Sequence, residues 1–97
     1  MRIVWSPFAI QRVIEISRYI EQESPKNSLS FTQEIFKRVE GLKQFPKIGK
    51  FVPELEERNT REIIFSSFKI IYRIEEDRLL ILTVLHMRQF DWETNEI

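Results

Sequence analysis

The pattern of apolar and polar residues at the start of the chain predicts a short strand followed by a helix. Arg2–Trp5 is rich in β-branched and aromatic residues and stops at Ser6-Pro7, which predicts a strand and then a helix start, because serine caps free N–H groups and proline suits the first helical position. Apolar residues then recur at spacings of four, three and four, at Ala9, Val13, Ile16 and Ile20. This period predicts an amphipathic helix over residues 7–23.

A second Ser-Pro pair, Ser24-Pro25, predicts the end of this helix and the start of another. The apolar period resumes at Phe31 and continues to Phe45, where Pro46 interrupts it. We therefore expect a second helix from residue 25 to about residue 45. Because so short a connection leaves little room for another arrangement, the two helices should pack as an antiparallel hairpin.

The second half of the chain contains segments typical of β-strands. Residues 46–60 hold prolines, a glycine and clustered charges without a sustained period, which predicts a surface loop. Strands are expected at about residues 61–66, 68–75 and 79–86, the last being apolar enough for the centre of a sheet. The order β-α-α-β-β-β predicts an α+β fold, with an N-terminal strand, a helical hairpin and a three-strand antiparallel meander in one mainly antiparallel sheet.

Length and composition limit the classes of function. The 97 residues predict a single domain over 1–97, with 89–97 as a C-terminal tail. The absence of cysteine excludes thiolate catalysis and, with one histidine, argues against a metal site. We expect no cofactor and no small-molecule substrate. The N-terminus lacks the apolar core of a signal peptide, and no apolar run approaches the roughly 20 residues of a membrane helix, so a cytoplasmic location without a membrane partner is expected.

Charge is balanced overall but not along the chain. Residues 1–50 carry nine Lys/Arg against five Glu, whereas residues 51–97 carry six Lys/Arg against ten Asp/Glu, for a net charge of zero. Proteins that wrap nucleic acid usually have a basic excess, because phosphate contacts supply most of their affinity. Neutrality argues against extensive nucleic-acid wrapping and leaves room for a small basic cleft.

The strand pattern places several cations where they could form one site. Lys69 and Arg73 should project from one face of their strand, while Arg61 and Arg88 lie near the ends of neighbouring strands, with His86 two residues before Arg88. Such a cluster can hold phosphate oxygens or bind carboxylates of a partner. The alternative is that these are ordinary solvent-facing residues, and that the single histidine is structural.

Two apolar side chains lie where no core is expected. Phe51 falls in the predicted loop and Trp92 in the tail. Exposed aromatic residues in such places are candidates for a partner interface.

Motifs spread over residues 3–90 resemble the RelE/ParE superfamily, the toxins of type II toxin–antitoxin systems that are also called plasmid stabilisation proteins. No single motif is decisive, but their order and spacing are specific. The elements that carry the resemblance are Trp5-Ser6-Pro7-Phe8-Ala9, Tyr19-Ile20, Ser24-Pro25, Leu42-Lys43-Gln44-Phe45-Pro46-Lys47-Ile48-Gly49-Lys50, Val52-Pro53-Glu54-Leu55, Arg61-Glu62-Ile63, Ile70-Ile71-Tyr72-Arg73-Ile74 and His86-Met87-Arg88.

The resemblance implies a cognate antitoxin that wraps the toxin and covers its working surface, and it implies one of two targets. RelE-like members are endoribonucleases that cut messenger RNA on the ribosome. In that case Lys69, Arg73 and Arg88 would neutralise phosphate, with His86 as a proton carrier. ParE-like members poison DNA gyrase, are not enzymes and lack that catalytic set.

The tail departs from the ribonuclease pattern. RelE-like members frequently carry a C-terminal tyrosine, whereas residues 89–97 contain no tyrosine and three acidic residues. Acidic charge beside an RNA cleft is unfavourable. We therefore expect a ParE-like toxin that inhibits gyrase by protein–protein contact. The alternatives are a ribosome-dependent endoribonuclease and a degenerate, non-toxic binding module.

Overall fold

A computed structural model describes residues 1–52 and 59–87 of the chain. The elements run in chain order as β1 (Arg2–Trp5), α1 (Pro7–Glu21), α2 (Pro25–Gly41), β2 (Lys50–Phe51), β3 (Thr60–Phe65), β4 (Phe68–Ile74) and β5 (Arg78–His86). Neither helix in this part of the chain is both long and apolar enough to cross a membrane.

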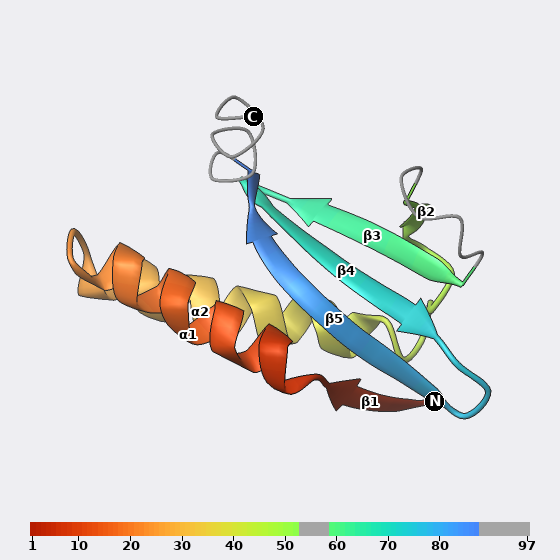
Figure 1. The fold of residues 1–97 in the computed structure, drawn as a ribbon. Helices are drawn as coiled ribbons and strands as arrows, with labels where there is room; N and C mark the ends of the chain where they lie inside the picture. Colours follow the sequence, from red (N-terminus) through yellow and green to blue (C-terminus); the bar gives the residue numbers. More distant parts are fainter. Residues whose placement is uncertain (53–58, 88–97) are drawn as a thin grey trace, which may run out of the picture.

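The described strands form one sheet in the order β1-β5-β4-β3-β2. Strands β3, β4 and β5 pair antiparallel as a meander, and β1 joins the outer side of β5 in parallel. Both helices lie together against one face of the sheet (Figure 1). The predicted α+β fold, with its helical hairpin and antiparallel meander, is confirmed, and β5 lies inside the sheet as its apolar sequence indicates.

Both helices start where the sequence predicts. The Ser6 hydroxyl accepts a hydrogen bond from the Ala9 N–H at 3.0 Å, and the Ser24 hydroxyl accepts one from the Asn27 N–H at 3.1 Å. A proline follows each cap at the first helical position, where its missing N–H removes no bond.

The predicted end of the second helix is wrong by about four residues. Helix α2 ends at Gly41, and the chain continues through tight turns in which the N–H of Lys43 bonds the carbonyl of Glu40 and that of Gln44 bonds the carbonyl of Gly41. Glycine disfavours continued helix, while apolar side chains beyond it keep the helical spacing. The predicted loop also contains the two-residue strand β2, which pairs with β3 at Arg61 and Glu62.

The core lies between the helices and one face of the sheet. Its fully buried members include Ala9 from α1, Ile35 from α2, and Ile70, Tyr72, Leu79, Ile81 and Val84 from the sheet. Burial of these side chains supplies most of the free energy that holds the layers together. We call the opposite side of the sheet, which the helices do not cover, the open face.

A bulge in β5 reverses the side-chain alternation of that strand. Tyr72 pairs with Ile81 and Ile71 pairs with Thr83, so Leu82 has no partner across β4. The Leu82 carbonyl instead accepts a hydrogen bond from the Ser6 hydroxyl at 3.1 Å. Before the bulge Leu79 and Ile81 face the helices, and after it the even-numbered positions do, because an extra residue shifts the two-residue period by one.

Candidate functional site

The open face carries two of the predicted cations. Lys69 and Arg73 project from β4 on this face, four residues apart, which corresponds to about 13 Å along a strand. The Lys69 Nζ lies 3.3 Å from an oxygen of Glu62, and the Arg73 Nε lies 3.1 Å from an oxygen of Glu75. Each cation is therefore already next to a carboxylate of its own chain.

Arg61 does not join them, and the prediction that it shares their site is wrong. It pairs directly with Tyr72 and therefore projects toward the helix side of the sheet. There its guanidinium donates to the carbonyls of Lys47 at 3.1 Å and Gly49 at 2.7 Å, and it lies 4.2 Å from the centre of the Phe51 ring. Arg61 fixes the chain before β2.

His86 is also on the other side of the sheet from Lys69. It pairs with Phe68, and its imidazole meets the Phe68 ring edge-on at 4.9 Å between centroids. The bulge at Leu82 is the physical reason, since uninterrupted alternation from Ile81 would put residue 86 on the open face. The structure thus separates the imidazole from Lys69 and Arg73.

Phe51, Arg88 and Trp92 are the remaining predicted site residues. Phe51 is 55% exposed on β2, in keeping with an apolar group available to a partner, although Arg61 covers one side of its ring. Arg88 and Trp92 lie outside the described residues. Within the described ranges no three His, Cys, Asp or Glu side chains gather as metal ligands would.

Sequence reasoning missed a buried hydrogen-bonded clamp around Tyr72. The Tyr72 hydroxyl donates to the Pro46 carbonyl at 2.7 Å and accepts from the Gly49 N–H at 3.0 Å. A Cβ on Gly49 would lie 2.5 Å from that hydroxyl oxygen, so only glycine fits. Burial raises the pKa of Tyr72, against the smaller opposing effects of the Gly49 N–H and Arg61. The sequence shows the motif Phe45-Pro46-x-x-Gly49, but it does not show that this motif contacts Tyr72 of β4.

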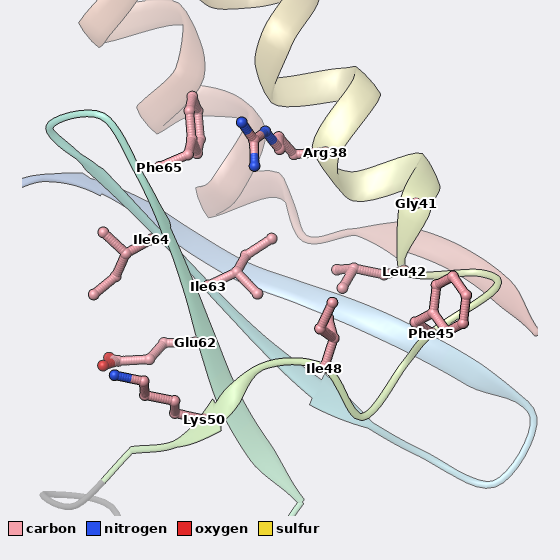
Figure 2. A pocket seen from close by; sticks show the side chains of 10 residues that line it. All are labelled: Arg38, Gly41, Leu42, Phe45, Ile48, Lys50, Glu62, Ile63, Ile64 and Phe65. Carbon is pink, nitrogen blue, oxygen red and sulfur yellow. The ribbon is translucent and has the colours of Figure 1, made fainter.

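The clamp shapes one side of a groove between α2 and the edge of β3. Figure 2 shows Arg38 from α2, Leu42 directly after that helix and Ile63 from β3 around a common space, with Lys50 and Glu62 at one end. The groove has a volume of about 520 Å³ and is lined by Arg38, Gly41, Leu42, Phe45, Ile48, Lys50, Glu62, Ile63, Ile64 and Phe65. Phe45 and Ile48 are 60% and 67% exposed. Apolar side chains left this open are typical of a surface that another chain covers.

Known proteins resemble this chain over nearly its whole length. The model of the family described as "ParE toxin of type II toxin-antitoxin system, parDE" matches residues 3–90. A protein of Sinorhizobium fredii, named "Putative toxin Y4kP", is 33% identical over 90 residues, which cover 91% of this chain and 90% of that protein.

A solved structure shares the fold. It is described as "Chromosomal ParDE TA system from P. aeruginosa", and its matching chain superposes with a TM-score of 0.73 at 22% identity, over 89% of this chain and 95% of the other. The helical hairpin, the antiparallel meander and the family match over residues 3–90 agree, and this chain belongs to the ParE toxin family of type II toxin–antitoxin systems.

Proposed function

We propose that this chain arrests growth by binding DNA gyrase in the cytoplasm, and that a cognate antitoxin neutralises it. The observation that carries the proposal is the ParE family match over residues 3–90. The zero net charge supports a protein target, because a nucleic-acid target would favour a basic excess.

We place the contact with the target on the open face, around Lys69 and Arg73. Both side chains are partly exposed and held by neighbouring carboxylates. Cations fixed in this way lose little rotamer freedom when a partner binds, so they suit a protein interface. The separate position of His86, against Phe68, favours binding over proton-transfer chemistry.

A supercoiling assay with purified gyrase and relaxed plasmid tests this function. Added in excess and free of antitoxin, the chain should block supercoiling. Preincubation with the antitoxin encoded beside its gene should restore supercoiling. Full supercoiling in the presence of excess folded chain would overturn the proposal.

The place of the target contact is tested by Arg73→Ala. If Arg73 lies in the interface, its truncation should raise the concentration of the chain needed for half-inhibition by at least about fivefold. Truncating an energetically important interface residue to alanine costs about 1 kcal/mol or more of binding free energy. Lys43→Ala is the matched control, because Lys43 is a cation paired with Glu40 at 2.9 Å, away from the open face. If the Arg73→Ala and Lys43→Ala variants inhibit gyrase equally well, Arg73 does not belong to the target contact.

The ribonuclease alternative rests on Lys69 and Arg73 sharing one face. Toeprinting of a translated message discriminates, since a ribosome-dependent endoribonuclease would produce new cuts at the A site. We expect none. The non-toxic alternative predicts induced expression without growth arrest in a host that carries the natural target.

A further inference from the structure

The two helices carry exposed apolar side chains on a side of the hairpin that does not face the sheet. Ile10 and Ile14 of α1 are 48% and 43% exposed, and Leu29 and Phe36 of α2 are 60% and 46% exposed. Each of the four directly follows a buried residue, so it lies roughly 100° further round its helix. We call these four residues the outer seam.

The outer seam lies where α1 and α2 meet. Ser17 is on the same flank of α1 as the two isoleucines, and its carbonyl accepts a hydrogen bond from the Ser28 hydroxyl of α2 at 2.8 Å. From α2, the Phe36 ring reaches to 5.1 Å from the ring of Trp5, two residues before α1. The helices lie side by side over one face of the sheet (Figure 1). The seam is therefore one apolar patch, of the kind that marks an interaction site.

The spacing of the seam residues is symmetric about one level of the hairpin. The bond between Ser28 and Ser17 puts these two residues level with each other, so in an antiparallel pair Arg12 is level with Gln33. The two isoleucines lie two residues before and two residues after Arg12. Leu29 and Phe36 lie four residues before and three residues after Gln33.

This symmetry makes the seam complementary to itself. A two-fold axis across both helices at the level of Arg12 and Gln33 would bring Ile10 of one copy against Ile14 of the second copy. The same axis would bring Leu29 against Phe36 of the second copy. A surface that meets its own image in this way fits a dimer with an isologous interface.

The charges at the ends of the seam agree with the same axis. Lys26 lies one turn before Leu29 and Glu40 lies one turn after Phe36, each seven residues from Gln33, so Glu40 would meet Lys26 of the second copy. Both residues are exposed. The carboxylate would also lie near the N-terminus of α2 in the second copy, where the helix dipole favours negative charge. The net charge of zero leaves no overall repulsion between two copies.

We propose that the outer seam binds a second copy of this chain in a two-fold symmetric dimer. The two hairpins form a layer of four helices between the two sheets, and both open faces point outward. This inference goes beyond the proposed function, and its interface contains neither Lys69 nor Arg73.

Sedimentation velocity of the purified chain, free of antitoxin, tests the dimer at roughly 1 to 200 µM. The mass should rise with concentration toward twice the 11.8 kDa of one chain. Leu29→Glu puts a charge into the apolar contact and should raise the dissociation constant of the dimer at least about tenfold.

Tyr19→Glu is the matched control. Tyr19 is 69% exposed and lies nine residues from Ile10, roughly two and a half turns along α1 and so on its opposite side. This variant should dimerise within about twofold of the original chain, because the seam is unchanged. Circular dichroism establishes that each variant is folded. A monomer at every concentration, or a dimer that Leu29→Glu leaves intact, would overturn the proposal, as would equal loss in both variants.

An exchange of charges tests the alignment of the two copies. Lys26→Glu would face Glu40 of the second copy at two places in the dimer and should weaken it by about threefold or more. Adding Glu40→Lys re-forms both pairs with their signs exchanged and should restore the affinity to within about twofold of the original. If the double variant is as weak as Lys26→Glu alone, the proposed two-fold arrangement is wrong.

Discussion

At the residue scale the most informative side chain is Tyr72. It is completely buried, its hydroxyl satisfies two backbone groups of the chain before β2, and it lies opposite Arg61, which binds two carbonyls of the same segment. These two side chains hold the backbone of the segment from Pro46 to Gly49 in place, and this segment forms one side of the groove. Their roles follow from long-range contacts, so neither could be assigned from local sequence.

We expect Tyr72→Phe to lower the free energy of unfolding by about 1–3 kcal/mol, because the Gly49 N–H and the Pro46 carbonyl lose their partner inside the protein. Urea unfolding measures this. Tyr19→Phe removes the same hydroxyl from a side chain that is 69% exposed and should change stability by no more than about 0.5 kcal/mol. Similar small effects of both substitutions would show that the clamp contributes little.

The raised pKa of Tyr72 gives stability a dependence on alkaline pH. In the unfolded chain the phenol ionises near its ordinary value of 10.0, whereas burial keeps it protonated to higher pH in the folded chain. Its contribution is therefore present below about pH 10 and is lost as pH rises through the folded pKa. Urea unfolding midpoints from about pH 8 to 11 should fall more steeply for the original chain than for Tyr72→Phe. Parallel curves would contradict this.

At the element scale the bulge in β5 decides how the sheet presents its side chains. It turns His86 toward Phe68 and leaves Lys69 and Arg73 on the open face without an imidazole beside them. The sequence from Leu79 to Leu85 is almost uniformly apolar, so nothing in it marks where alternation slips. The Ser6 hydroxyl, which bonds the Leu82 carbonyl from the other end of the chain, is part of what supports the bulge.

Ser6→Ala tests this support. It removes both the cap of α1 and the bond to the Leu82 carbonyl, so it should cost more than Ser24→Ala, which removes only the cap of α2. A cap alone is worth about 0.5–2 kcal/mol, and the second bond should add about 1 kcal/mol. Thermal or urea unfolding of the two variants gives the difference. An equal loss would mean that the bulge does not depend on Ser6.

At the scale of the whole molecule, sequence patterns predicted the fold well, but they did not predict on which face of the sheet each candidate site residue lies. The two Ser-Pro caps, the period of α1 and the apolar run of β5 are local signals, and each marked its element. Convergence of side chains depends on register and bulges instead, so Arg61 and His86 were expected beside Lys69 and lie on the helix side. Arg38 could not be placed at the groove from sequence, because an exposed helical arginine has no distinguishing sequence signal.

The central claim is that this member of the ParE family acts on gyrase, and plasmid topology in growing cells tests it most directly. After induced expression, plasmid DNA should become relaxed as growth stops, and co-expression of the antitoxin encoded beside the gene should restore both supercoiling and growth. Growth arrest with fully supercoiled plasmid and newly cut messenger RNA would contradict the account.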